Sequence, residues 1–525
     1  MARVSLATGR PPEELVEEAR AARRAHRLSR RELLQGAALG AAGLAVGCSP
    51  RVLRSGPAER STVPAGAETP VVIVGAGIAG LTAAYRLQQA GVAVRVLEAQ
   101  DRVGGRMWSL RGAFADDQVV ELGGELIDTG HTAIRGLCDE LCIQLDDLTA
   151  DDPTLDTDLW FFGGRRRSDA EVVAAFVPVA RRIEEDLATI TGEVTYRTPS
   201  GAERLDRTTL AEWIAGCEAE AWFRELLTVA YTTEYGLETE RQSALNLLLL
   251  IDPEAPPFRI FGDSDERFRV HEGNDAIARE LARRLDPAIE TGSRVEALRE
   301  LADGSFALSV RRGAESREVR APHVVLALPF TLLRQVEIAM ELPAVKRRAI
   351  DELGYGTNAK LMVGFSERVW RSDYDSNGSV FAELPFQTTW ETSRLQPGRA
   401  GVLTNFTGGD HGVEIGRGTP EEQAALMVAG LERVFPGVAA RREGMAVARF
   451  HWPSFPWTLG SYASYLPGQW TGICGAEGER VRRLHFAGEH CSLAAQGFME
   501  GGCETGEAVA REILADLGLA LPRAA

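Results

Sequence analysis

Three glycines and one acid near the start of the chain have the spacing of a dinucleotide-binding site. Gly75, Gly77 and Gly80 directly follow a short β-branched run, and Glu98 ends the next apolar run. In such a site the first glycine permits a tight turn, the second lets backbone approach a pyrophosphate, and the third lets helix and strand pack closely. The acid then accepts hydrogen bonds from the adenosine ribose, so the spacing predicts a bound dinucleotide, with FAD and NAD both open.

A strand, a helix and a second strand are needed to position these residues. Residues 71–74 are β-branched, which indicates a buried parallel strand. Apolar residues then recur at helical spacing in residues 81–87, and residues 92–97 have a second strand pattern. This order predicts an α/β, Rossmann-like fold.

The residues after the acid carry a resemblance to a known family. Residues 101–106 read Asp-Arg-Val-Gly-Gly-Arg, and residues 121–125 read Glu-Leu-Gly-Gly-Glu. Both segments resemble the flavin-containing amine oxidases, the group of monoamine, polyamine and L-amino-acid oxidases. The resemblance implies FAD rather than NAD, with Arg106 neutralising the pyrophosphate. It also implies that Gly123 and Gly124 lay backbone against the flavin ring.

The C-terminal part of the chain carries the same resemblance. Gly488 and Glu489 follow a short strand pattern, and a Gly-Phe-Met-Glu-Gly-Gly run at 497–502 opens a helix that extends to residue 514. In the family the Gly-Glu turn supports the ribityl and phosphate groups. The resemblance implies that the Met499 amide, at the positive end of the helix dipole, faces the flavin pyrimidine, and that the backbone of Val295 contacts adenine.

Four positions match the reacting side of the family site. Lys360 begins a strand pattern and corresponds to a lysine that holds a water against the flavin N5 atom. Tyr462 and Phe498 correspond to an aromatic pair that flanks the substrate amine, although the family usually has Tyr at both places. Ser461 stands where monoamine oxidases carry a cysteine bonded to the flavin. The resemblance therefore implies FAD bound without a covalent link.

Substrate identity is less constrained by the sequence. L-amino-acid oxidases of the venom type hold the substrate carboxylate with an arginine shortly after the paired glycines, but here Glu125 occupies that neighbourhood. Taken alone, this favours a plain amine or a cationic substrate. Trp390 and Arg394 lie in a segment similar to bacterial members, and with Glu125 they are the candidate substrate residues. Arg394 could bind a carboxylate from another direction, although a surface position for Arg394 is slightly favoured.

The resemblance implies oxidation of a C–N bond. An amine or L-amino acid becomes an imine by hydride transfer to flavin N5, O2 becomes H2O2, and the imine hydrolyses to aldehyde or 2-oxo acid plus ammonia. Two alternatives stay open: a C–C desaturase of the phytoene desaturase or protoporphyrinogen oxidase type, and a non-catalytic exported flavoprotein. Whether O2 is the acceptor, as in an oxidase, or another oxidant, as in a dehydrogenase, also stays open.

The length of 525 residues predicts two domains. A discontinuous FAD-binding domain is expected from residues 70–130, 271–330 and 475–520. An α+β substrate domain with helical insertions is expected from residues 131–270 and 331–474. Helical periodicity within it covers residues 170–188, 210–231 and 244–250.

The first 69 residues are typical of an export signal and linker. A twin arginine at Arg30 and Arg31 precedes an apolar run at 33–46, which is too short to span a bilayer. This resembles a twin-arginine translocation signal and predicts a periplasmic or extracellular protein. Cys48 follows a segment similar to a lipoprotein cleavage box, so a lipid anchor on Cys48 is left open.

The net charge of the chain limits the classes of ligand that it can bind. Lys plus Arg number 58 and Asp plus Glu 75, a net charge of −17, which argues against nucleic acid and mildly favours cationic substrates. The eight histidines show no metal-ligand spacing, so no metal site is predicted. A homodimer is left open.

Overall fold

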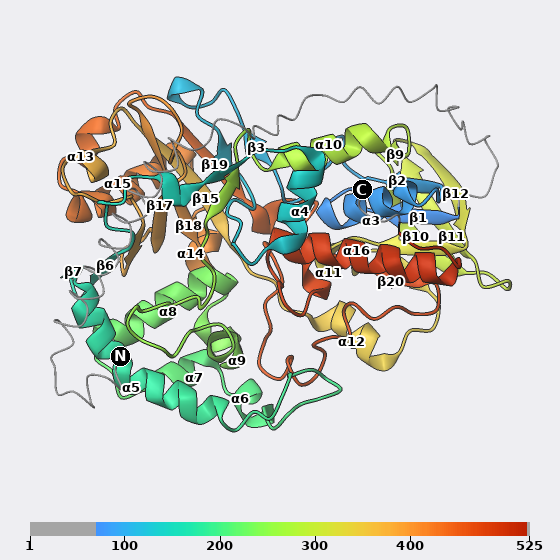
Figure 1. The fold of residues 1–525 in the computed structure, drawn as a ribbon, viewed down its shortest axis with the longest axis horizontal. Coiled ribbons are helices and arrows are strands. Elements are labelled where there is room, and N and C mark those ends of the chain that lie inside the picture. The colour runs from blue at the N-terminus through green and yellow to red at the C-terminus, as the bar shows by residue number, and fades with distance from the viewer. Residues whose placement is uncertain (1–69, 522–525) are drawn as a thin grey trace, which may run out of the picture.

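The computed structural model describes residues 70–521. The predicted twin-arginine signal, the linker and Cys48 lie outside these residues. Two lobes are visible in Figure 1, one around β1 (Val71–Val74) and one around β15 (Ala359–Phe365). Among the helices of residues 70–521, none is both long enough and apolar enough to cross a membrane.

The first lobe is built on a five-stranded parallel sheet in the order β20-β13-β1-β2-β9. Besides β1, its strands are β2 (Val94–Leu97), β9 (Ile289–Glu290), β13 (His323–Leu326) and β20 (Leu484–Phe486). On one face pack α3 (Ile78–Gln89), α4 (Thr132–Leu141), α10 (Asp275–Leu285) and α16 (Met499–Asp516). The predicted α/β, Rossmann-like fold is confirmed, and it joins segments from both ends of the chain.

The other face of this sheet is covered by a four-stranded sheet in the order β12-β11-β10-β14. Its strands are β10 (Arg294–Glu300), β11 (Phe306–Arg312), β12 (Glu315–Ala321) and β14 (Glu337–Ala339). The short helices α11 (Phe330–Leu333) and α12 (Ala344–Glu352) pack in the same core. Apolar side chains of both sheets therefore exclude water from the strands that carry the glycine motif.

The second lobe has a seven-stranded sheet in the order β19-β15-β18-β17-β16-β6-β7. Besides β15, its strands are β6 (Leu159–Phe162), β7 (Arg165–Arg167), β16 (Val380–Ala382), β17 (Thr388–Glu391), β18 (Gly401–Thr407) and β19 (Val447–His451). The helices α13 (Val369–Ser372), α14 (Gly409–Glu414) and α15 (Pro420–Val434) accompany it. Two small ribbons connect the lobes: β3 (Ser109–Leu110) with β4 (Val120–Glu121), and β5 (Leu145–Asp147) with β8 (Phe268–Val270).

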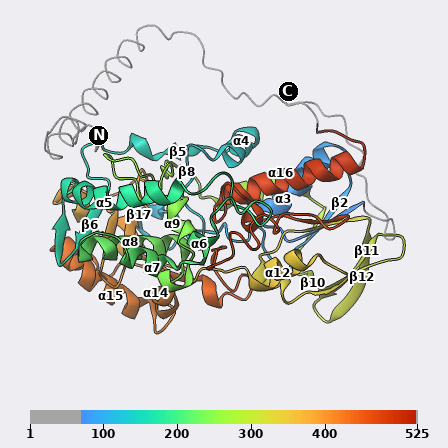
Figure 2. The same cartoon turned by 90° about the horizontal axis from the view of Figure 1, so that it is seen from below.

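A helical insertion completes the second lobe. It contains α5 (Asp169–Leu187), α6 (Glu203–Arg207), α7 (Leu210–Ala215), α8 (Ala221–Tyr235) and α9 (Leu245–Leu248). Figure 2 shows these helices gathered at the end of the molecule opposite β11 and β12. The helix expected over residues 210–231 is broken into α7 and α8, because Gly216 caps α7 and helix resumes only at Ala221.

The hydrophobic cores place the domain boundaries differently from the sequence prediction at two points. The boundary at residue 130 falls before α4, although Ile134 and Leu137 of that helix lie in the core of the first lobe. The boundary at residue 475 falls after Ala463 and Ile473, which already pack beneath the four-stranded sheet. Each segment buries its apolar face against the first lobe, and hydrophobic burial rather than the motif positions decides where the lobe ends.

One grouping of possible metal ligands forms although no spacing predicts it. His323 and His485 come from neighbouring strands, and their ligand atoms lie within 4.8 Å of one another and of Asp516. Burial, together with the charge of His485, lowers the pKa of His323 to about 4. This cluster lies at the opposite end of α16 from Met499 and is separate from the glycine motif.

Candidate active site

A cavity of about 890 Å³ joins the glycine motif of the first lobe to aromatic side chains of the second. Of the residues expected to bind the cofactor, the following line it: Gly75, Gly77, Glu98, Arg106, Gly123, Gly124, Val295, Gly488, Glu489 and Met499. Gly80 does not line the cavity. A Cβ there would overlap the Gly75 carbonyl oxygen, so Gly80 serves the close packing of helix on strand that the motif predicts.

The N-terminus of α3 opens onto one end of the cavity. Gly77 is its N-cap, and no side chain caps the amides of the first turn. A Cβ on Gly77 would meet no protein atom within 4 Å, because the residue borders the cavity. Free helix amides beside an open space fit a pyrophosphate.

Glu98 lies at the same end with part of its hydrogen-bonding capacity used. Its Oε2 accepts from the Ala76 amide at 2.7 Å and its Oε1 from the Gln100 amide at 2.8 Å. Burial raises the pKa of Glu98, and these two amides act against that rise. Each carboxylate oxygen can accept a second bond, so ribose hydroxyls can still be bound.

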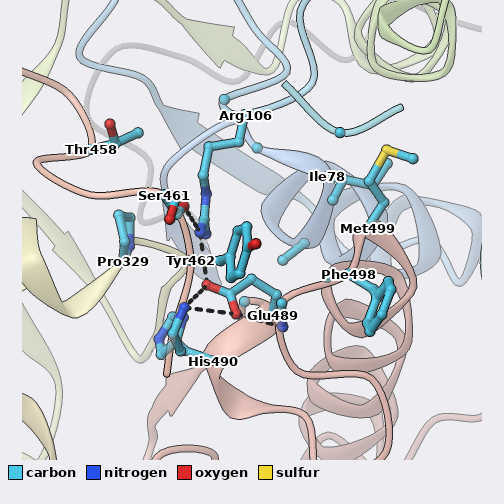
Figure 3. Close-up of a pocket in the computed structure, with 18 of the residues that line it drawn as sticks. Ile78, Arg106, Pro329, Thr458, Ser461, Tyr462, Glu489, His490, Phe498 and Met499 are labelled. Carbon is cyan, nitrogen blue, oxygen red and sulfur yellow. Dashed lines mark hydrogen bonds and ion pairs between the residues drawn. The ribbon is translucent and has the colours of Figure 1, made fainter. Parts of the chain in front are cut away.

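Arg106 and Glu489 form an ion pair in the middle of the cavity (Figure 3). The Nη1 atom of Arg106 donates to Glu489 Oε1 at 2.7 Å and to the Ser461 carbonyl at 2.8 Å. Glu489 also accepts from the Gly497 amide at 2.9 Å. Glu489 therefore orients Arg106 and the turn before α16, while the rest of the guanidinium remains for a phosphate.

The start of α16 forms the next part of the wall. Phe498 is its N-cap, and no side chain caps the first turn, which begins at Met499. A Cβ on Gly124 would collide with the Met499 side chain, so this backbone lies close against the helix start. His490 adds two buried ring nitrogens that have no partner among residues 70–521. The open amides at this helix start fit the polar edge of a flavin.

Ser461 places no thiol at the position of the family's covalent link. Its hydroxyl donates to Asn358 Oδ1 at 2.7 Å. Cys474 also lines the cavity, but burial raises its pKa to about 12, which leaves almost no nucleophilic thiolate.

Lys360 is engaged differently from the prediction. Its Nζ donates to Glu125 Oε2 at 2.7 Å, to the Gly123 carbonyl at 2.8 Å and to the Glu121 carbonyl at 3.3 Å. An ammonium has three N–H donors, so none is left to hold a water. Lys360 instead fixes the Gly123 backbone against the cavity, and a water could be held only if the longest bond opened.

Glu125 was expected to contact substrate, but its carboxylate is already occupied. Besides Lys360, it accepts from Trp390 Nε1 at 2.9 Å and from Thr392 Oγ1 at 2.5 Å. Burial acts to raise the pKa of Glu125, yet the charge and bonds of Lys360 outweigh it and the pKa is lowered. A buried carboxylate needs such partners, which explains why Glu125 pairs inward.

The other two expected substrate residues separate in the structure. Trp390 lines the cavity, and its ring faces the Lys360 ammonium at 5.2 Å. Arg394 is half-buried and is not among the residues that line the cavity. The role of Arg394 as the partner of a substrate carboxylate therefore stays a prediction, made from outside the described cavity wall.

Tyr462 and Phe498 both line the cavity beside the start of α16 (Figure 3). The Tyr462 hydroxyl donates to the Glu234 carbonyl at 2.5 Å. Burial raises the pKa of Tyr462 well above 10, so it stays a neutral phenol. The Phe498 ring packs on His131 with centroids 5.1 Å apart. Both rings are thus held by the protein before any ligand enters.

Sequence reasoning missed two acids of the cavity wall. Glu234 near the end of α8 and Glu266 before β8 both line the cavity. Neither belongs to a motif, and neither is near a predicted site residue in the sequence. An acid in the last turn of a helix, where it opposes the helix dipole, is the one local signal that could have drawn attention to Glu234.

A parallel-sheet dinucleotide cradle that opens into an aromatic-walled chamber fits a flavin-dependent oxidoreductase. The family model described as flavin containing amine oxidoreductase matches residues 78–514, and the chain belongs to that family. FAD is therefore its cofactor.

Known relatives act on both amines and amino acids. The chain is 25% identical to an L-amino acid dehydrogenase of Synechocystis sp. over 84% of this chain and 94% of that protein. It is 26% identical to a flavin-dependent L-tryptophan oxidase of Lentzea aerocolonigenes over 85% of this chain and 98% of that protein. Among solved structures, cyclohexylamine oxidase of Brevibacterium oxydans has a TM-score of 0.76 at 22% identity, covering 86% of this chain and all of the other.

Proposed function

We propose that this protein is an FAD-dependent oxidase of amines or L-amino acids, with the flavin bound non-covalently. In that reaction the substrate becomes an imine, O2 is reduced to H2O2, and the imine hydrolyses to an aldehyde or 2-oxo acid plus ammonia. Bound FAD supplies the hydride acceptor and passes the electrons on.

One observation carries this proposal. The cavity that holds the dinucleotide cradle continues without a break to Lys360, Tyr462 and Phe498. A carbon–nitrogen bond placed between the two rings would therefore lie beside the backbone of Gly124 and Met499, where the cofactor site ends. A desaturase of long hydrocarbons would need neither the buried ion pair of Lys360 nor a phenol fixed at the cavity wall.

The chain's own residues orient the substrate and exclude water. Tyr462 and Phe498 supply rigid aromatic walls, since hydrogen bonding and ring packing hold both side chains. Trp390 closes a further side, and its indole is held by Glu125. Lys360 donates to the Gly123 carbonyl and so keeps the adjoining backbone in one position. Preorganised groups of this kind need no rearrangement when the substrate reacts.

A peroxide assay of the flavin-loaded protein with amines and L-amino acids tests the proposal. Peroxide formation with at least one substrate is expected. Flavin bleaching without peroxide would indicate a dehydrogenase, and silence with every compound would favour the desaturase or the non-catalytic alternative. Acid precipitation should release all flavin into solution, whereas a flavin that stays with the protein would contradict non-covalent binding.

We also propose export by the twin-arginine route, which carries folded proteins and so suits a cofactor loaded beforehand. The support is the paired Arg30 and Arg31 before the apolar run at 33–46. Replacing both arginines by lysine should leave the protein inside the cell. Metabolic labelling with a fatty acid, compared between the native chain and Cys48→Ser, tests the lipid anchor.

A further inference from the structure

Two carboxylates in the substrate half of the cavity form no ion pair within residues 70–521, although Arg394 lies close enough to Glu266 to act on its charge. Glu234 lies near the end of α8, next to the Tyr462 hydroxyl that its own carbonyl binds. Glu266 lies just before β8, and both residues line the cavity. Among the ion pairs and hydrogen bonds within residues 70–521, neither carboxylate has a positively charged partner.

The cations that line the cavity are committed elsewhere. Lys360 is paired with Glu125, and Arg106 is paired with Glu489. Arg294 precedes Val295 on β10, at the end expected to hold adenine. Arg394 acts on Glu266 from outside the cavity wall but forms no ion pair with it among the described residues.

The surroundings make this excess of negative charge unfavourable without a ligand. Burial, followed by the charges of Glu266 and Asp128, raises the pKa of Glu234 to about 8. Glu266 is exposed as a residue, but its removal from bulk water inside the cavity, followed by Asp128, raises its pKa to about 7, with Asp158 and Glu125 adding to the rise and Arg394 opposing it. A cation that entered the cavity would relieve this repulsion.

The backbone of Glu266 is also held in an unusual conformation. Its φ is +44°, in the left-handed region, and its amide donates to Asp128 Oδ1 at 2.8 Å. A non-glycine residue keeps such a conformation only where its surroundings impose it. The Asp128 bond thus fixes the backbone at Glu266, whose residue lines the cavity.

We propose that the substrate carries a second cationic group, an ammonium or a guanidinium, which binds to Glu234 and Glu266 while the reacting amine lies at Tyr462 and Phe498. This specificity rests on the oxidase function proposed above. Diamines and basic L-amino acids share the required chemistry. Diamines fit better, since none of the described residues supplies an uncommitted cation in the substrate half of the cavity wall to receive a carboxylate.

Matched substrate pairs test the proposal on the flavin-loaded enzyme. Pentane-1,5-diamine is compared with pentylamine, and L-arginine with L-citrulline, so that each pair differs mainly in the distal charge. We expect kcat/KM to favour the cationic member by roughly 10- to 100-fold, the range of a hydrogen bond to a charged group. In Glu234→Gln and Glu266→Gln this preference should shrink, mainly through KM.

Glu225→Gln is the matched control, because Glu225 lies on the same helix but not on the cavity wall. The preference of Glu225→Gln for the cationic substrates should equal that of the native enzyme. Flavin content should be unchanged in Glu225→Gln, Glu234→Gln and Glu266→Gln. A diamine preference alone assigns the site to diamines, whereas an arginine preference assigns it to basic amino acids.

Equal turnover of both members of each pair would overturn the cation site and leave the oxidase function standing. Silence of all four compounds, together with every other amine, would overturn the oxidase function instead. Calorimetric titration under argon with the diamine and pentylamine gives a readout that needs no turnover. Equal Kd values in that titration would also contradict the cation site.

Discussion

The two ends of the cavity are built on different principles. At the dinucleotide end the protein presents mainly backbone, namely glycines, two helix N-termini and the amides of short turns, with Glu98 and Arg106 as charged side chains. At the substrate end it presents charged and aromatic side chains from both lobes, among them Lys360 with Glu125 and the acids Glu234 and Glu266. The first end is therefore suited to a fixed cofactor, and the second can vary its ligand through a few side chains.

The largest expected effect comes from blocking the backbone end. Gly77→Val should fold, because its Cβ meets no protein atom, but it should lose most bound flavin, since the side chain would fill the space left for the pyrophosphate. Flavin-to-protein ratio after purification measures this. Gly136→Val is the control, since Gly136 is exposed on α4 with equal room and lies outside the cavity.

A flavin-to-protein ratio in Gly77→Val equal to that of the native protein would contradict the assignment of this space to the pyrophosphate. Unfolding of Gly77→Val, seen by circular dichroism, would instead show that the residue supports the fold.

At the side-chain end, breaking the buried ion pair should have the next largest effect. Lys360→Met should lower the free energy of unfolding by about 3–5 kcal/mol, because it leaves the Glu125 carboxylate buried without its cation. The double variant Lys360→Met/Glu125→Gln should recover most of this loss. Urea unfolding of the three proteins measures it, and equal stability of the single and double variants would argue against a coupled pair.

The single variant Lys360→Met should also slow the reduction of the flavin by substrate, measured in a single turnover. Lys346→Met is the control, since Lys346 is also buried but donates to the Glu477 carbonyl away from the cavity. Reduction in the Lys346 variant should keep the native rate. An unchanged rate in the Lys360 variant would remove Lys360 from the catalytic site.

Binding at the substrate end of the cavity should depend on pH through Glu234 and Glu266. Glu266 and Glu234 have pKa values raised to about 7 and about 8, so they are neutral below that range and charged above it. The KM of a dicationic amine should therefore fall, relative to that of pentylamine, as pH rises from about 6 to about 9. Dividing the KM of the dicationic amine by the KM of pentylamine corrects for ionisation of the reacting amine, which both compounds share. A ratio that stays flat would mean that these acids do not bind the substrate.

The smallest effect is expected from Tyr462→Phe. The variant keeps the aromatic wall but removes the hydrogen bond to the Glu234 carbonyl, which should cost about 0.5–1.5 kcal/mol of stability. Thermal unfolding measures this change, and kcat/KM should fall no more than about tenfold. A complete loss of activity would mean that the hydroxyl itself takes part in the reaction.

The same contrast decides how much could be predicted from the sequence. Gly75, Gly77 and Glu98 lie close together in the chain and act through local backbone geometry, which their spacing encodes. The pairing of Lys360 with Glu125 and the position of Arg394 depend on how β15, β17 and the Gly123 segment meet. Glu234 and Glu266 come from segments that only tertiary packing brings to one wall, so no local pattern predicts that they meet there.

The central claim, that this cavity couples a bound flavin to amine oxidation, is tested most directly by anaerobic mixing. The flavin-loaded protein is mixed with one equivalent of pentane-1,5-diamine per flavin under argon, its visible absorption is followed, and air is then admitted. The account predicts bleaching of the oxidised flavin by the amine, then return of the colour with one H2O2 formed per flavin. A flavin that stays oxidised with this and every other amine and amino acid would contradict the account.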